Sequence, residues 1–240
     1  MTGGSRSGRR VVVVSPHFDD AVLSLGATMA SWSRRGSHVT LLTVLGCDPD
    51  SLAPAGGWDA RAGFETEAAA ARARRQEDRR ACSVVGASPV WLPFGSLDYD
   101  RHGDDDAVRG AVRSAIDGAD AVLLPGSPLT HPDHAWLVRM LVDGALPCDQ
   151  LGFYAEQPYT HRKRELTEPL LAPAGAWPGG TPILERVAAR DWLAKLRAAR
   201  CYRSQLPLLG LSRGAGAPLI GLVWSDVRRG GEAVAWAADG

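Results

Sequence analysis

Two short clusters of histidine and aspartate carry the side chains best suited to chemistry, and they lie more than a hundred residues apart. The first is Pro16–Asp20, with the sequence PHFDD, and the second is His131–His134, with the sequence HPDH. Catalytic zinc sites use three protein ligands, usually histidine or carboxylate, and leave a fourth position for water. We therefore expect a divalent cation to be held by His17, Asp20 and His134.

The remaining members of the two clusters could carry out acid–base chemistry beside that cation. A bound divalent cation lowers the pKa of a coordinated water and makes it a nucleophile at neutral pH. Asp19, which is not needed as a ligand, is then placed to accept the proton of the attacking water. A protonated His131 could stabilise an oxyanion and protonate a leaving amine, and Asp133 could orient its ring. This set of side chains predicts a hydrolase.

Each cluster alone has a simpler interpretation. A His-x-x-Asp at a helix start is often a cap with a polar neighbour, and His131 and His134 alone could be surface histidines. The metal site is favoured because both clusters follow apolar strands and both open predicted helices. Of the other histidines, His38 is expected to be structural, whereas His102 and His161 lie in loops that could approach a substrate.

The elements that must position these clusters alternate between strand and helix. Apolar runs predict strands at residues 11–14, 38–45, 90–92, 121–124 and 151–155, and helices are predicted at residues 19–35, 63–85, 107–116, 135–144 and 184–202. This alternation predicts an α/β, Rossmann-like fold with a mostly parallel sheet and helices on both faces. Ligand sites in such folds lie at the carboxyl ends of the strands, where both clusters fall. After residue 202 we expect an irregular tail with an edge strand at 219–224.

The whole chain, residues 1–240, is interpreted as one domain, because no strong boundary interrupts it. We expect residues 1–10 to be disordered, residues 46–60 to form a loop and the Pro- and Gly-rich residues 158–182 to form a surface excursion. The only apolar run near the start is Val11–Val14, so neither a secretory signal nor a membrane span is expected. The four scattered cysteines are typical of a reduced, cytoplasmic protein.

Charge and loop chemistry argue against three classes of partner. Lys plus Arg number 27 and Asp plus Glu number 27, so the formal net charge of +0 indicates neither a nucleic acid nor an anionic membrane. The first strand is not followed by the Gly-x-Gly-x-x-Gly turn that a dinucleotide needs. A small-molecule substrate is the expected partner, and a homo-oligomer is compatible with the sequence.

At its two clusters the chain resembles the PIG-L / LmbE-like family of zinc-dependent N-deacetylases. The opening motif of that family, Pro/Ala-His-Pro-Asp-Asp-Glu, corresponds to Pro16–Ala21, and its second motif is intact at His131–His134. Weaker agreement, over a span of residues 11–205, comes from Arg74, Glu77, Asp98, Lys195 and residues 202–205. Phe18 stands where the family has Pro and Ala21 where it has Glu, and neither change removes an expected ligand.

The resemblance implies a lactate-dehydrogenase-type sheet without a dinucleotide, and it implies roles for individual residues. Zinc, or another divalent ion such as Fe²⁺, would be held by His17, Asp20 and His134. Asp19 would be the general base, and His131 would stabilise the oxyanion with Asp133 tuning its ring. Two further residues, implied to contact the sugar, are Arg74 and Asp98.

The reaction implied by the resemblance is removal of an N-acyl group, most simply N-acetyl, from an amino sugar or glycoside. Two alternatives stay open. The same chemistry could act on a larger amide, such as a thiol conjugate or an N-acyl natural product. A different class of protein, a sugar-binding module without catalysis, could use an inherited pocket, although binding alone has no use for a base beside a metal.

Overall fold

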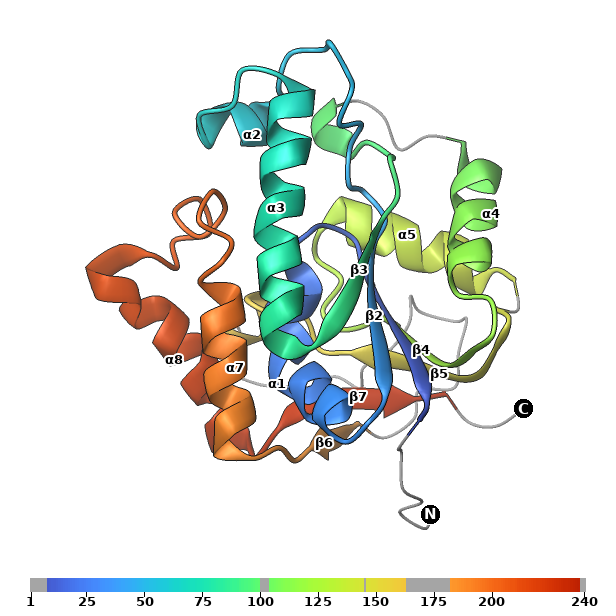
Figure 1. Cartoon of the computed structure of the whole chain (residues 1–240), viewed down its shortest axis with the longest axis vertical. Helices are drawn as coiled ribbons and strands as arrows, with labels where there is room; N and C mark the ends of the chain where they lie inside the picture. Colours follow the sequence, from blue (N-terminus) through green and yellow to red (C-terminus); the bar gives the residue numbers. More distant parts are fainter. Residues whose placement is uncertain (1–7, 100–103, 145, 163–181, 238–240) are drawn as a thin grey trace.

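The described part of the chain in this computed structural model comprises residues 8–99, 104–144, 146–162 and 182–237. It forms a seven-stranded sheet in the order β3-β2-β1-β4-β5-β7-β6 (Figure 1). The strands are β1 (Arg10–Ser15), β2 (His38–Thr43), β3 (Ala87–Trp91), β4 (Ala119–Pro125), β5 (Cys148–Tyr154), β6 (Ile183–Glu185) and β7 (Glu232–Trp236). The strands β3, β2, β1, β4 and β5 are parallel to one another, whereas β7 runs antiparallel to its neighbours β5 and β6. The predicted α/β fold with a mostly parallel sheet is confirmed.

Helices cover both faces of this sheet (Figure 1). The longer helices are α1 (Asp20–Arg34), α3 (Glu67–Val85), α4 (Asp105–Ala115), α5 (Pro132–Val142), α7 (Ala189–Ala199) and α8 (Arg213–Arg229). Helices α1, α3 and α7 share one apolar core, and α4 and α5 share the other. Short helical turns are found at α2 (Gly57–Arg61), η1 (Leu97–Tyr99) and α6 (Tyr159–Arg162).

The four valines of β1 explain why this strand is central. Val11 and Val13 pack into the core with α1 and α3, and Val12 and Val14 pack into the core with α4 and α5. Successive side chains of a strand point to opposite faces, so an uninterrupted apolar run suits a strand that is covered on both sides. Because β1 lies between β2 and β4, the residues that follow it emerge in the middle of the sheet edge.

The C-terminal part differs from the sequence-based expectation. The predicted helix at 184–202 is wrong at its start, because Ile183–Glu185 forms β6 and α7 begins only at Ala189. The predicted edge strand at 219–224 is wrong as well, since these residues lie inside α8. Leu219 and Leu222 are buried whereas Ile220 and Trp224 are exposed, which is a helical spacing. A run of six residues, five of them apolar, is too short to reveal this spacing. The tail that was expected to be irregular forms β7.

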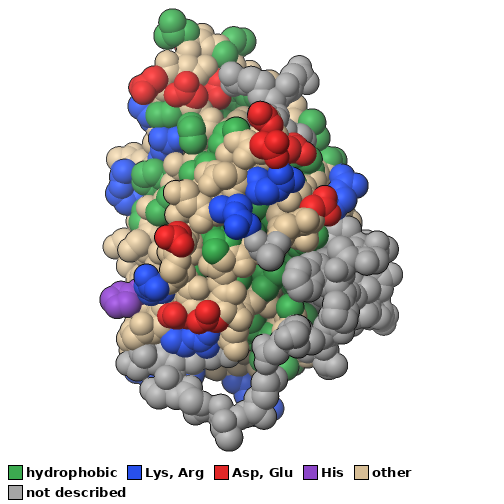
Figure 2. Space-filling view, turned by 90° about the vertical axis from the view of Figure 1, so that its right-hand side faces the viewer, with side chains coloured by type: hydrophobic (Ala, Val, Ile, Leu, Met, Phe, Trp, Pro, Cys, Tyr) green, Lys and Arg blue, Asp and Glu red, His purple; other side chains and the backbone are tan. Residues whose placement is uncertain are grey.

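Some expectations fall on residues outside the described ranges. These are residues 1–7 of the expected disordered start, His102 with its neighbours 100–103, and residues 163–181 of the expected excursion. The loop expected at 46–60 contains the start of α2, which begins at Gly57. None of the helices within the described ranges has the length and apolar character that crossing a bilayer requires. Acidic and basic side chains are interspersed on the face shown in Figure 2.

A buried charge network joins α7, α8 and β7 to α1. The ammonium of Lys195, which is fully buried, lies 2.7 Å from Asp226 Oδ2 and 2.6 Å from Glu232 Oε1. Helix α1 is irregular at Leu25, and the Glu232 carboxylate accepts the backbone N–H groups of Ala27 (3.2 Å) and Thr28 (2.7 Å) just after this kink. The network therefore satisfies backbone donors that the kink leaves outside the helical pattern.

Candidate active site

The two sequence clusters meet at the carboxyl edge of the sheet because β1 and β4 are adjacent and parallel. After β1, Ser15 Oγ donates a hydrogen bond to the His17 carbonyl (2.5 Å) and accepts one from the Ala21 N–H (3.1 Å), which closes a tight turn. After β4, His131 is the N-cap residue of α5 and Pro132 occupies its first turn. A strand end and a helix start thus position each cluster.

Three side-chain atoms from these clusters form a small triangle. His17 Nδ1 lies 3.1 Å from Asp20 Oδ2, His134 Nε2 lies 3.2 Å from the same oxygen, and the two nitrogens are 3.2 Å apart. Ligands about 2.0–2.1 Å from a tetrahedral zinc ion are separated from one another by about 3.3 Å. The triangle therefore has the dimensions of one face of a tetrahedral coordination shell.

Neighbouring carboxylates determine which ring nitrogens carry hydrogen. Asp133 Oδ2 lies 2.9 Å from His17 Nε2, and Glu156 Oε1 contacts His134 Nδ1. A carboxylate accepts, so these two nitrogens donate, and the nitrogens at the triangle are left as lone-pair acceptors. In this tautomer the three acceptors lie about 3 Å from one another, and a cation placed among them would satisfy all three. The donor set therefore fits a divalent metal ion.

The same carboxylates make the site electrostatically suited to positive charge. Burial lowers the pKa of His134, but the charges of Asp20 and Glu156 outweigh it and raise the pKa well above its ordinary value. Burial likewise lowers the pKa of His17, and hydrogen bonds to Asp133 and Asp20 raise it above the usual range. Both imidazoles thus lie in a field that favours an added cation.

His131 is the third histidine of this group, and its geometry differs from the expectation. One ligand atom of each of His17, His131 and His134 lies within 4.8 Å of the others, so His131 is close enough to be considered as a ligand. Its Nδ1 accepts a hydrogen bond from the Asp133 N–H (3.2 Å), and it therefore carries no proton there. Burial, together with His17 and His134, lowers the pKa of His131 to about 4. With Nδ1 accepting, the ring can donate from Nε2 without being an imidazolium, and its expected role at the oxyanion stays a prediction.

Asp133 also differs from the expectation, because its main ring partner is not His131. Its Oδ2 lies 2.9 Å from His17 Nε2 and 3.9 Å from His131 Nδ1. Its other oxygen accepts the backbone N–H of Leu97 at 3.3 Å. Asp133 is buried, so its carboxylate holds the His17 ring and η1 together.

Glu156 is the functional residue that sequence reasoning missed. It follows β5, is buried, and contacts the ring of His134 from the side opposite the triangle. A signal was present, because β5 is the parallel neighbour of β4 and a carboxylate after it emerges at the same sheet edge.

Replacing Glu156 with glutamine should weaken metal binding without abolishing it. The amide keeps the shape of the side chain but loses the charge that supports the His134 tautomer, and such second-sphere changes typically cost about 10–100-fold in affinity. Competition titration with a metal chelator measures this. Glu185→Gln, a change on β6, is the matched control, and equal metal affinity in the two variants would contradict the role of Glu156.

Asp19 lies beside the triangle without belonging to it. It precedes α1, yet its side chain makes no capping hydrogen bond, so the simple N-cap interpretation does not apply. Burial and the charge of Asp20 raise the pKa of Asp19 to about 6, and Arg74 opposes this shift. A buried carboxylate with a raised pKa at a cavity wall is suited to proton transfer.

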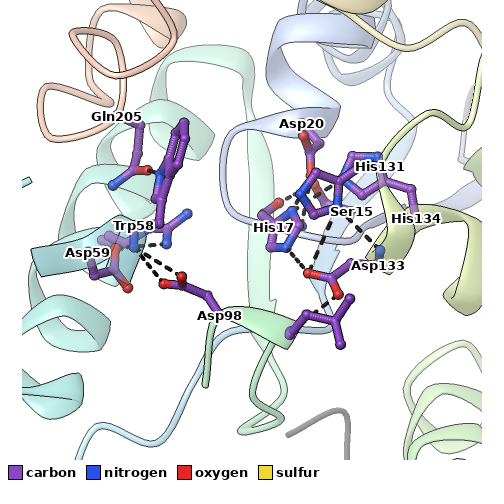
Figure 3. A network of polar contacts seen from close by, with 12 residues as sticks. Ser15, His17, Asp20, Trp58, Asp59, Asp98, His131, Asp133, His134 and Gln205 are labelled. Atoms are coloured by element: carbon purple, nitrogen blue, oxygen red, sulfur yellow. Dashed lines mark hydrogen bonds and ion pairs between the residues drawn. The ribbon is translucent and has the colours of Figure 1, made fainter. Parts of the chain in front are cut away.

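The two expected sugar-contacting residues line the same cavity. Figure 3 shows Asp98 beside Trp58 and Asp59, away from the three histidines. Arg74 Nη1 pairs with Asp59 Oδ1 at 3.1 Å, and Asp59 Oδ2 accepts the Tyr99 hydroxyl at 2.6 Å. Arg74 Nε has no hydrogen-bond partner among the described residues. Asp98 accepts the backbone N–H of Trp58 with both oxygens, at 3.0 and 2.8 Å, and so joins η1 to α2.

Both departures from the family motif are buried. The Phe18 ring is 1% exposed, and the Arg74 guanidinium lies over it at 5.1 Å from its centre. Phe18 therefore forms an aromatic support for a cavity-lining arginine. Ala21 is fully buried in the first turn of α1, where a glutamate would meet the apolar core that contains it.

A cavity of about 620 Å³ brings these groups together. The lining residues are His17, Asp19, Asp20, Trp58, Asp59, Arg74, Ser96, Leu97, Asp98, His131, Pro132, Asp133, Pro158, Tyr159, Gln205, Leu208 and Leu209. Its volume lies within the range of small-molecule sites, roughly 300–1,000 Å³. The site can thus present a cation, a free carboxylate and an imidazole donor to one bound molecule.

Comparison with known proteins agrees with this arrangement. The model of the GlcNAc-PI de-N-acetylase (PIG-L) family matches residues 12–144. The 2'-N-acetylparomamine deacetylase of Streptomyces fradiae is 35% identical over 177 residues, which are 64% of this chain and 59% of that protein. The chain therefore matches less than two thirds of that relative's length.

Solved structures extend the likeness over nearly the whole chain. The A40926 pseudoaglycone deacetylase Dbv21 is 27% identical, with a TM-score of 0.75 over 95% of this chain and 96% of that one. The zinc inhibited form of teicoplanin deacetylase Orf2 is 22% identical, with a TM-score of 0.77 over 95% and 98% of the two chains. At that identity the second likeness concerns the fold alone.

Proposed function

Because the chain belongs to the GlcNAc-PI de-N-acetylase family, we propose that it is a metal-dependent hydrolase that removes an N-acetyl group from an amino sugar within a glycoside. One observation carries the proposal: three acceptor atoms of His17, Asp20 and His134 converge at the wall of a cavity. Asp19 lines the same cavity, and its carboxylate makes no helix-capping hydrogen bond. The names of the relatives, a deacetylase of paromamine and one of a pseudoaglycone, support the substrate class.

The ion that suits the site best is zinc. Two imidazoles and one carboxylate form a usual ligand set of catalytic zinc, and Fe²⁺ can occupy the same set. When bound, the cation supplies positive charge that acidifies a water and polarises the amide carbonyl.

The side chains of the protein carry out the remaining steps. Asp19 accepts a proton from the attacking water while the water oxygen forms a bond to the acetyl carbon. The Nε2–H of His131 donates a hydrogen bond to the carbonyl oxygen as it gains negative charge. Asp19 then gives the proton to the nitrogen, the carbon–nitrogen bond breaks, and acetate and the free amine are released. Asp133 acts by orienting His17.

The Asp19→Asn variant should keep its metal and lose most of its turnover. Asparagine has nearly the same shape but cannot accept the proton, and loss of a general base typically costs about 10²- to 10⁴-fold in kcat. Asp149→Asn, at an exposed position of β5, is the control and should retain full activity. Metal content and acetate release are measured on the same samples, and unchanged kcat in Asp19→Asn would remove the proposed base.

A release assay tests the proposed function against its alternatives. The metal-loaded protein is incubated with N-acetyl amino sugars, their glycosides, longer N-acyl analogues and N-acyl thiol conjugates, and the freed amine is measured. Release from amino-sugar amides supports the proposal, whereas release only from the larger amides favours the second substrate class. Binding of sugars without any release indicates a binding module instead.

A further inference from the structure

We propose that Trp58 determines substrate specificity by stacking on the second ring of a glycoside, the ring attached to the N-acetylated sugar. This inference rests on the proposed deacetylase function. Trp58 and Gln205 lie across the cavity from His17 and His131 (Figure 3). An amide placed at the histidines leaves the far part of the substrate next to Trp58.

The indole of Trp58 is held in a defined position. Its Nε1–H donates a hydrogen bond to Gln205 Oε1 at 2.6 Å. Gln205 is 1% exposed, and its Nε2 donates to Ser204 Oγ (2.9 Å), which in turn donates to Glu77 Oε2 (2.7 Å). This chain of bonds reaches α3 and directs the glutamine oxygen toward the indole. A side chain fixed in this way loses little entropy when a ligand binds.

The indole is not needed to attach α2 to the rest of the protein. The backbone of Trp58 is bound by Asp98, and Asp59 is bound by Arg74 and Tyr99. The close fit at Gly56, where an added Cβ would lie 2.4 Å from Asp98 Oδ2, indicates tight backbone packing at the same place. The hydrogen bond from the ring to Gln205 therefore orients the ring in the cavity wall.

The environment of the ring indicates what it would contact. The guanidinium of Arg61 lies 5.2 Å from the centre of the indole, and Arg61 does not line the cavity whereas Trp58 does. Leu208 and Leu209 line the cavity as well, so they add apolar surface to that of Trp58, while Asp98 and Arg74 add charged groups. A pyranose or cyclitol ring offers C–H groups on its faces and hydroxyl or amino groups at its edge. Such a ring can pack on Trp58 while its edge reaches Arg74 and Asp98.

Two probes that differ by one ring test the inference. N-acetylglucosamine has one ring, whereas N,N'-diacetylchitobiose and 2'-N-acetylparomamine carry a second. Trp58→Ala should raise KM for the two-ring probes by about 3- to 10-fold, the equivalent of one aromatic contact, and leave kcat unchanged. KM for N-acetylglucosamine should stay the same. Trp58→Phe, which keeps an aromatic face, should retain most of the discrimination.

Two controls separate this inference from the proposed function. Trp224→Ala removes an indole that is 59% exposed on α8 and does not line the cavity, so it should change neither KM. Calorimetric titration of the two-ring probes into Asp19→Asn, with and without Trp58→Ala, measures binding in the absence of turnover. If no probe releases acetate, the proposed function fails, but the binding difference still decides the role of Trp58. The inference is overturned if Trp58→Ala loses the same affinity for one-ring and two-ring probes, or loses affinity for neither.

Discussion

Replacing His134 with alanine is expected to remove the metal ion and reduce deacetylation to the background rate. His134 supplies one corner of the acceptor triangle and is 1% exposed, so no solvent-exposed group can take its place without rearrangement. The remaining two ligands, His17 and Asp20, form an incomplete set. Elemental analysis after dialysis measures the loss, which should bring the content well below one ion per chain.

His131→Ala is the matched comparison, because this ring lies beside the triangle with its centre 4.8 Å from that of His134. It should keep its metal and lose activity, since its Nε2–H is expected to act on the carbonyl oxygen. Ligands that bind only the folded state raise Tm, so a chelator should lower Tm of His131→Ala and leave Tm of His134→Ala unchanged. Full metal content in His134→Ala, or its loss in His131→Ala, would overturn the ligand assignment.

Lys195→Met is expected to destabilise the protein by about 3–5 kcal/mol, the usual cost of leaving buried charge without its partner. Lys195 lies between Asp226 and Glu232, all three are buried, and methionine would keep only the volume of the side chain. Chemical denaturation followed by circular dichroism measures the free energy of unfolding. Arg109→Met, which breaks a partly exposed ion pair on α4, should cost at most about 1 kcal/mol.

The destabilisation should depend on pH in a defined direction. Burial raises the pKa of Glu232, and Lys195 opposes this shift, so the lysine-free variant holds a carboxyl with a still higher pKa. A carboxyl whose pKa is raised in the folded state favours folding while it is neutral, and that contribution is lost as pH rises through its folded pKa. The deficit of Lys195→Met should therefore be smaller in acid than at neutral pH. A deficit that grows on acidification would contradict this account.

The central part of the fold and the core of the site could be predicted from local sequence. The valine run of β1 and the clusters at its end and after β4 depend on neighbouring residues only, and the parallel sheet then brings them together. The prediction that His17, Asp20 and His134 converge agrees with the distances between their side chains. The roles of these residues stay predictions until variants are measured.

The parts that sequence reasoning did not find depend on distant contacts. The backbone of Trp58 in α2 is held by Asp98, forty positions away, so nothing next to Gly57–Arg61 indicates a helix. β6 and β7 stabilise one another as an antiparallel pair although some fifty residues separate them. Asp133 was expected to hold His131 but contacts His17, because the direction of a side chain in a helical first turn depends on tertiary packing.

The double attachment of Asp133 limits how this protein can acquire new substrates. One oxygen holds the imidazole of His17 and the other holds the backbone of Leu97, immediately before Asp98. Grafting a different loop at residues 95–99 to admit another substrate would therefore also alter the orientation of the His17 imidazole. Laboratory evolution toward new glycosides should consequently accumulate changes at the lining positions Trp58, Gln205, Leu208 and Leu209, and spare the loop that shares this carboxylate.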